Sequence, residues 1–389
     1  MGCDAPGTPG LTPPTAVFDE TGLDRLVTVL RERGCEVIGP VRGESAIELG
    51  PLHSADDLPR GWGVHTEPGV YRLENRGDGA RFGHSAGPQS WKQYLHPPRR
   101  RLWSSGPDLT GDPEPAQPEA VPRYAFLGVR GCDLAAIATL DRVLGGGGHE
   151  DSHYTGRRRR VFVVAVNCTE PGELCFCASM HTGPAAGPGY DLALTELVDG
   201  QRCRYVAAAG SDEGAEVLAQ IPHEAAAPAD RDAAADGVRR AADQMGRRMP
   251  DTDLRALLLE SRESPHWDDV ASRCLTCGNC TMVCPTCFCT STEDVTDLTG
   301  GHAERWQHWA SCFELDFSLV HQGSVRQSGA ARYRQWITHK LGTWHDQFDM
   351  SGCVGCGRCI AWCPTGIDIT AEMSTLAGLA ERTRDGDDD

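Results

Sequence analysis

The sequence predicts an α/β domain followed by a mainly helical domain whose loops carry closely spaced cysteines. Short apolar strand patterns alternate with helical patterns up to about residue 250. Helical patterns dominate after that point, and two cysteine runs of identical spacing lie near the C-terminus. We therefore expect an α/β docking domain over 17–245 and a second domain over 251–380. The ends, 1–16 and the acidic tail 381–389, are expected to be disordered.

The α/β domain is predicted from strands that alternate with amphipathic helices. Apolar residues at helical spacing predict helices over Leu23–Arg33, Leu134–Leu144 and Glu213–Ile221, and the glycines at 145–148 end the second of these. The predicted strands are Glu36–Ile38, Tyr124–Val129, Val161–Val166, Leu192–Leu197 and Tyr205–Ala209. The Pro-rich stretch Gly106–Pro122 is predicted to be a loop or lid within this domain.

The two cysteine runs share the pattern C-x2-C-x2-C-x3-C-P. In this pattern three thiolates hold one cubane iron–sulfur cluster, and the fourth cysteine, beside a proline, binds the other cluster. Zinc sites usually use two separated pairs of ligands instead, and disulfide frameworks belong to short secreted chains. The sequence therefore predicts two [4Fe–4S] clusters. Their predicted ligands are Cys274, Cys277, Cys280 and Cys363 for one cluster, and Cys353, Cys356, Cys359 and Cys284 for the other.

The long interval between the two runs is predicted to be helical, over Ala303–His321 and Ala331–Gln347. A further helix is predicted over Asp251–Glu263, with Thr252 or Asp251 as its cap. This layout resembles the alpha-helical ferredoxin domain of the iron–sulfur subunits of succinate dehydrogenase and heterodisulfide reductase. Helices of this kind would exclude water from the clusters, which is one control on their potentials. For Arg273, Asn279 and Arg358, next to predicted ligands, surface solvation is expected rather than tuning of the clusters.

Other cysteines gather in two Cys-Phe-Cys segments, which raise the possibility of a third metal site between the domains. The candidate ligands are Cys168, Cys175, Cys177, Cys287, Cys289 and Cys312. The alternative is that these are buried free thiols packed as small apolar groups. Cys132 lies where a strand is followed by a helix, so it is a candidate ligand or reactive thiol, or part of a turn capped by Asp133. Cys3, Cys35 and Cys203 are isolated and are expected to be inert.

Composition and missing motifs narrow the function. The net charge of −18 argues against nucleic-acid binding, which needs a basic surface. No signal peptide is visible, and the longest apolar run, Val161–Val166, is too short to cross a membrane. A cytoplasmic protein is therefore expected. No G-x-G-x-x-G motif follows a strand, so nicotinamide or flavin binding by this chain has no support. The clusters supply electron transfer, and the chain itself is expected to be non-catalytic.

Several segments together resemble a known family: SWKQYLHPPRRRLW (90–103), GVRGCDLAAI (128–137), NCTEPGELCFCASMHTGP (167–184), YDLALTEL (190–197), CPTCFC (284–289), RYRQWITHK (332–340) and GCVGCGRCIAWCPTGIDIT (352–370). They are similar to the beta subunit of sulfhydrogenase, a soluble NAD(P)-linked [NiFe] hydrogenase, and to the iron–sulfur electron-transfer subunit of the anaerobic sulfite reductase. The resemblance covers about residues 20–375. It implies an iron–sulfur subunit that relays electrons between a flavin-binding partner and a catalytic subunit.

Three functions remain open from the sequence. The first is a relay between an NAD(P)H-linked flavoprotein and the small and large subunits of a [NiFe] hydrogenase. The second is the same relay serving a sirohaem subunit that reduces sulfite. The third is a free-standing iron–sulfur redox sensor or carrier. The hydrogenase relay is favoured by the overall resemblance, and the identity of the partner chains would decide between the first two.

Overall fold

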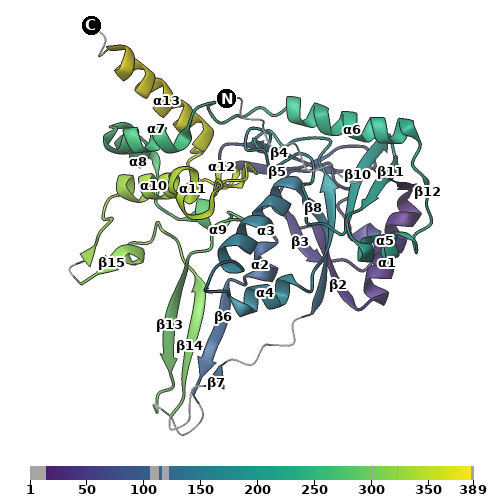
Figure 1. The fold of residues 1–389 in the computed structure, drawn as a ribbon, viewed down its shortest axis with the longest axis horizontal. Helices are drawn as coiled ribbons and strands as arrows, with labels where there is room; N and C mark the ends of the chain where they lie inside the picture. Colours follow the sequence, from purple (N-terminus) through teal and green to yellow (C-terminus); the bar gives the residue numbers. More distant parts are fainter. Residues whose placement is uncertain (1–14, 106–113, 116–121, 300, 322, 387–389) are drawn as a thin grey trace.

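The computed structural model describes residues 15–105, 114–115, 122–299, 301–321 and 323–386. Its N-terminal part is built on an eight-stranded sheet with the order β12-β1-β11-β10-β9-β8-β2-β3 (Figure 1). The four central strands β2, β8, β9 and β10 are parallel, and the outer strands pair antiparallel. The strands are β1 Ala16–Phe18, β2 Cys35–Arg42, β3 Ile47–Pro51, β8 Arg123–Arg130, β9 Phe162–Asn167, β10 Leu192–Asp199, β11 Arg202–Ala209 and β12 Glu224–Ala225.

Helices cover both faces of this sheet. One face packs against α1 and α5, and the other packs against α2, α3 and α4, with α6 near the β11 end. Successive residues of β9 alternate between the two cores, with Val164 on one side and Val163 and Ala165 on the other. Burial on both faces explains why the central strands are continuously apolar. These helices are α1 Glu20–Glu32, α2 Lys92–Leu95, α3 Gly131–Leu144, α4 Ser152–Arg158, α5 Asp212–Leu218 and α6 Pro228–Asp243.

The five predicted strands and three predicted helices of this part are all present, with ends shifted by a few residues. Strand β1 begins at Ala16, which lies within the segment expected to be disordered. Residues 1–14 lie outside the described residues, as does most of the predicted loop 106–122, apart from the short strand β7, Glu114–Pro115. Helix α13, Ile369–Gly386, extends into the tail that was expected to be disordered, and 387–389 lie outside the described residues.

The C-terminal part is mainly helical. Its helices surround an apolar core that includes Trp267, Tyr333, Trp336 and Met373. Asp253 caps α7 by accepting from the backbone N–H groups two and three residues on, so the prediction of Thr252 or Asp251 as the cap was wrong. The elements are α7 Leu254–Glu260, α8 His266–Arg273, α9 Asn279–Met282, α10 Gly329–Thr338, a π-helical turn His339–Thr343, α11 Trp344–Phe348, α12 Arg358–Ala361 and α13.

One predicted helix was wrong. The segment Ala303–His321 begins with a strand, β14 (Ala303–Trp309), rather than a helix. β14 pairs with β13 (Thr290–Thr296) and with β6 (Arg99–Ser104), and the three strands project from the body as an arm (Figure 1). The Arg99 guanidinium lies 4.2 Å from the centre of the Trp306 ring across this pairing. The pairing with β6, a strand from a distant part of the chain, overrides the predicted helical preference of this segment.

The remaining short elements are two antiparallel hairpins and three 3-10 turns. They are β4 Trp62–Glu67, β5 Val70–Asn75, β15 Leu319–Val320, β16 Gly323–Ser324 and the 3-10 turns Ala55–Asp57, Ser261–Glu263 and Asp316–Ser318. The turn of the β4–β5 hairpin contacts the C-terminal part, where Gly69 N–H donates to the Ile360 carbonyl at 3.0 Å. None of the helices in the described part of the chain combines the length and apolar character of a membrane span.

Candidate metal centre

The two cysteine runs adopt the same local structure. In each run a glycine follows the second cysteine and has a left-handed backbone, with φ of 77° at Gly278 and 75° at Gly357. Each glycine starts a one-turn helix, α9 or α12, which carries the third cysteine. A glycine is favoured here because a left-handed backbone is costly for residues with a Cβ. The identical spacing in the sequence therefore produces two equivalent loops.

One cavity lies at the first run. Four predicted ligands line it together, three from the first run and Cys363 from the second: Cys274, Cys277, Cys280 and Cys363. The rest of its wall is mainly apolar and includes Phe313, Tyr333 and Ile367. Cys277 and Leu275 are exposed, so this cavity lies close to the protein surface.

A second cavity lies at the other run. Its wall contains the remaining four predicted ligands, Cys284, Cys353, Cys356 and Cys359, together with Phe176, Lys340 and Arg358. Cys284 and Cys353 are buried. The eight predicted ligands thus line the two cavities, with the fourth cysteine of each run at the cavity of the other run and Cys359 at both, and the two sets of four cluster ligands stay a prediction. Trp336 and Cys359 line both cavities, which are therefore neighbours.

The walls of the cavities fit a sulfur-rich cluster. The Tyr333 hydroxyl and the Trp336 indole N–H are buried and have no hydrogen-bond partner among the described protein atoms. Both residues line the first cavity, and Trp336 also lines the second. Buried donors without partners are costly, whereas the inorganic sulfides of a cluster accept hydrogen bonds. The four thiols and these donors are the groups that a [4Fe–4S] cluster requires.

Backbone N–H groups point at the cysteine sulfurs in both loops. The Thr276 N–H donates to Cys274 Sγ at 3.4 Å, and at the matching position the Gly355 N–H donates to Cys353 Sγ at 3.4 Å. The Ile367 N–H donates to Cys363 Sγ at 3.3 Å. Such bonds stabilise thiolates and raise the potential of a bound cluster.

Lys340 is a buried cation beside the second cavity. Its Nζ donates to Cys284 Sγ at 3.4 Å, to Thr286 Oγ1 at 3.0 Å and to the Gly352 carbonyl at 3.0 Å. A hydrogen bond from Cys287 and the charge of Lys340 hold the pKa of Cys284 well below its ordinary value, whereas burial raises the pKa of Cys353 to about 12. Lys340 therefore favours negative charge in this cavity.

A second buried lysine, Lys92, reaches the same region from the α/β part. Its Nζ donates to the carbonyls of Cys284 and Cys287 at 3.0 and 2.9 Å, and it lies 3.8 Å from the centre of the Trp309 ring. Sequence reasoning missed both lysines. For Lys340 a signal existed, because it follows Trp336 by four residues and so shares the apolar face of the predicted helix. For Lys92 we find no comparable signal.

Of the three polar residues next to the ligands, Arg358 departs from expectation. Its side chain is 3% exposed, so the expectation of surface solvation was wrong. It pairs with Asp133 at 2.8 Å and donates through Nε to the Gly87 carbonyl at 3.1 Å. Arg273 instead bridges Asp269 and Glu372 at the protein surface, and Asn279 donates to the Trp362 carbonyl at 3.3 Å.

The candidate third-site cysteines separate into two sets. Cys168, Cys175 and Cys177 lie together with Cys132 in the α/β part. Cys287, Cys289 and Cys312 lie near Cys284 and Lys340 instead. Asp133 was also expected to cap the helix after Cys132, but it lies in the first turn of α3 and pairs with Arg358. Cys35 and Cys203 are buried in the sheet core, and Cys3 lies outside the described residues.

Comparisons with known proteins agree with this geometry. A family model described as a 4Fe-4S dicluster domain matches residues 273–367, which contain both cysteine runs. The sulfhydrogenase 2 subunit beta of Pyrococcus furiosus is 32% identical over 250 residues, covering 63% of this chain and 72% of that subunit. The chain belongs to the sulfhydrogenase beta-subunit family. No solved structure matches the chain significantly. This member of the family is an iron–sulfur protein that serves as an electron-transfer subunit, and its dicluster domain binds [4Fe–4S] clusters.

We expect Lys340→Met to lower the midpoint potential of the cluster at the second cavity. Reduction adds one negative charge to a cluster, and a buried ammonium nearby stabilises that charge. A unit charge about 4 Å away contributes about 4 kcal/mol at an effective dielectric constant near 20, so a shift on the order of 100 mV is expected. Redox titration followed by electron paramagnetic resonance (EPR) measures it. Lys340→Arg is the matched control, because it keeps a positive charge beside Cys284 Sγ. Equal shifts in the two variants, or none in Lys340→Met, would contradict this role.

Proposed function

We propose that this chain is the relay subunit of a cytoplasmic [NiFe] hydrogenase complex, passing electrons between an NAD(P)H-linked flavoprotein and the catalytic subunits. We further propose two clusters per dicluster domain, held by the two groups of four cysteines. Such clusters supply one-electron transfer and no bond chemistry, so the substrates must react elsewhere. The observation that carries the proposal is the pair of neighbouring cavities that share Trp336 and Cys359, one buried and one close to the surface.

The surface beside the first cavity supports transfer to a partner. The segment from Phe313 to Gly329 starts in the cavity wall and returns to Thr276, where a Cβ on Gly329 would lie 3.2 Å from the Thr276 methyl group. We call its exposed apolar side chains, together with the neighbouring Leu275, the apolar rim: Leu275, Leu315, Phe317, Leu319, Val320 and Val325. Val325 is 70% exposed and Leu275 is 64% exposed. Exposed apolar groups gathered beside one site are typical of a surface that binds another protein.

The α/β domain, which we propose to extend over 17–245, suits a docking role. Its sheet positions Lys92, Phe176 and the hairpin β4–β5 against the second domain, which we propose to extend over 251–380. No nucleotide-binding glycine motif occurs in the sequence, so the flavin and NAD(P)H are assigned to a partner. The relative from Pyrococcus furiosus, by its name a sulfhydrogenase subunit, supports the hydrogenase assignment.

The test is anoxic affinity purification of the tagged full chain from its native cells, followed by mass spectrometry. We expect a flavoprotein and a nickel–iron large subunit to co-purify. A sirohaem subunit would move the function to sulfite reduction, and recovery of the chain alone would favour a free carrier or sensor. The double variant Leu319→Asp/Val325→Asp should lose one of the partners because it places charge on the apolar rim. Val198→Asp, at an exposed position on β10, is the matched control and should retain both.

A further inference from the structure

We propose that Cys132, Cys168, Cys175 and Cys177 hold an additional [4Fe–4S] cluster in the α/β domain, beside the second cysteine run. This ligand set differs from the six-residue set expected from the sequence, because it includes Cys132 and omits Cys287, Cys289 and Cys312. The site does not depend on which partners the complex contains. It would operate in a hydrogenase, in a sulfite reductase or in a free carrier.

The topology of the sheet brings the four cysteines together. Cys132 follows β8 and Cys168 follows β9, and these neighbouring strands are parallel, so both residues lie at the same sheet edge. Cys175 and Cys177 lie in the loop that leaves β9. That loop folds back on itself, with the Cys168 N–H donating to the Pro184 carbonyl at 3.2 Å and the Thr182 N–H donating to the Cys177 carbonyl at 3.0 Å. The Cys132 and Cys177 side chains pack in one buried group. Four thiols from three parts of the chain thus converge on one place.

A buried cation is directed at this group. Arg130 Nη1 donates to Cys168 Sγ at 3.2 Å, and Nη2 donates to the carbonyls of Phe82 and His84 at 2.8 and 2.6 Å. Arg130 is 6% exposed. A buried guanidinium requires a nearby negative charge, and carbonyls supply only partial charge. Thiolates bound to a metal cluster provide the negative charge that neutral thiols do not.

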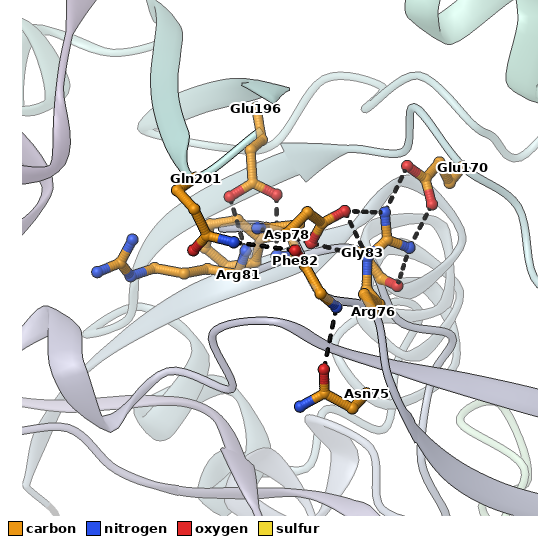
Figure 2. A network of polar contacts seen from close by, with 11 residues as sticks. Asn75, Arg76, Asp78, Arg81, Phe82, Gly83, Glu170, Glu196 and Gln201 are labelled. Carbon is orange, nitrogen blue, oxygen red and sulfur yellow. Dashed lines mark hydrogen bonds and ion pairs between the residues drawn. The ribbon is translucent and has the colours of Figure 1, made fainter. Parts of the chain in front are cut away.

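The loop whose Phe82 and His84 carbonyls accept from Arg130 makes a further network of polar contacts, which Figure 2 shows. Arg76 joins Asp78 and Glu170 and donates to the Gly83 carbonyl at 3.0 Å. The backbone N–H groups of Arg81 and Phe82 donate to the buried Glu196 carboxylate at 2.9 and 3.0 Å. Glu170 lies two residues after Cys168, so the same network fixes both the loop and the start of the cysteine segment. Supporting hydrogen bonds of this kind are what fix the groups around a metal site.

A second buried arginine lies on the side of the four-cysteine group that faces the second cysteine run. Arg358 pairs with Asp133, next to Cys132, and its Nη1 is buried with no hydrogen-bond partner among the described protein atoms. The two loops also touch through their backbones, because the Phe176 N–H donates to the Gly355 carbonyl at 2.9 Å. A Cβ at Gly355 would lie 2.6 Å from the Cys177 Cα, so only glycine fits at this contact. Cys356, a proposed ligand of the second cluster, packs against the apolar group that contains Cys132 and Cys177.

A cluster explains this group better than a single metal ion. Four thiolates around one zinc ion have their sulfurs about 2.3 Å from a common point. Among the described residues, no three His, Cys, Asp or Glu side chains are placed to hold a single ion. The eight cysteines of the two runs do not meet this condition either, since a cubane spreads its ligands over four separate irons. The four cysteines of the α/β domain, like the run cysteines, are therefore not placed around a single ion.

The test counts iron in the full chain, purified without oxygen and reconstituted with iron and sulfide. We expect about twelve irons per chain for the unmodified protein, and about eight for Cys132→Ser or Cys168→Ser, because each cubane holds four irons. EPR spectra of the reduced variants should keep the signals of the two run clusters and lose those of a third. About eight irons in the unmodified protein would overturn the proposal, whether or not one zinc is also bound.

Matched variants separate this ligand set from the alternative. The triple variant Cys287→Ala/Cys289→Ala/Cys312→Ala should keep about twelve irons, and so should Cys203→Ala in the sheet core. A loss of four irons from the triple variant, with none lost from Cys132→Ser, would overturn the assignment. Arg130→Gln should keep twelve irons but shift the third cluster to lower potential, since it removes the cation that faces Cys168. An unchanged potential there would contradict the role given to Arg130.

Discussion

Cys356→Ser should reduce electron flow through the complex to below about one hundredth of its normal rate. Replacing a residue that only supports the ligands of a metal site already costs about 10- to 100-fold in affinity, and loss of a ligand should cost more. Cys356 lines the second cavity, and it packs against the cysteine group of the α/β domain. Losing the cluster at this position would interrupt the path of the electrons between the other clusters. The measurement is NAD(P)H-linked activity of the intact complex, compared with direct assay of the catalytic subunit through an artificial mediator. The direct assay should remain, since the partner's own active site is not altered.

Two further sets of variants serve as controls for this experiment. Cys35→Ala and Cys203→Ala remove sulfurs buried in the sheet core, away from both cavities, and should leave iron content and activity unchanged. Cys284→Ser should remove the same EPR signal as Cys356→Ser, and Cys363→Ser the same signal as Cys277→Ser, because each pair lines one cavity. If Cys284→Ser instead matched Cys277→Ser, the exchange of ligands between the runs would be wrong. If Cys356→Ser left linked activity intact, the relay itself would be wrong.

Removal of iron should unfold most of the C-terminal part while the α/β sheet persists. Without clusters, the eight cysteines that line the two cavities would have no metal to hold their loops together. Metal binding to the folded state contributes directly to the free energy of folding, so the helices around these cysteines should loosen or unfold when the clusters are removed. Lys340 would also remain buried without the thiolate charge that balances it.

Hydrogen exchange measured by mass spectrometry resolves the two parts. After anoxic chelation, amides of α9, α10 and α12 should exchange rapidly, whereas those of the central strands β8, β9 and β10 should stay protected. Protection of the strands serves as the internal control, and reconstitution with iron and sulfide should restore protection of the helices. Equal protection of α10 before and after chelation would show that the helical core is stable without clusters.

The strongest predictions from the sequence rested on local rules. The fixed spacing of the two runs determined their loop shape, since Gly278 and Gly357 permit the left-handed turn that each cluster loop needs. The grouping of Cys363 with the first run and Cys284 with the second also followed from the pattern. The alternating apolar segments of the α/β part produced the predicted strands and helices, because burial on both faces of a parallel sheet leaves a clear pattern.

Features that depend on distant contacts were not predicted. The prediction of a helix was wrong at β14, which pairs with β13 just before it in the sequence and with β6 about two hundred residues earlier, and the pairing with β6 has no local signal. Arg358 resembles a surface residue until Asp133 is seen beside it. Cys132 could be joined to the other three cysteines of its group only after the sheet placed the ends of β8 and β9 side by side.

By itself, then, the sequence determined that this protein carries iron–sulfur clusters and which eight cysteines are the candidate ligands. Cluster binding depends on short cysteine spacings, and these are visible in the sequence without the fold. Only the tertiary structure decided which charges surround those cysteines. Lys92, Lys340, Arg130 and Arg358 reach the cysteines from separate elements, and their burial beside sulfur is a property of packing rather than of local pattern. Those charges set how readily a cluster accepts an electron. The sequence therefore identified the electron carriers, whereas the fold sets their reduction potentials.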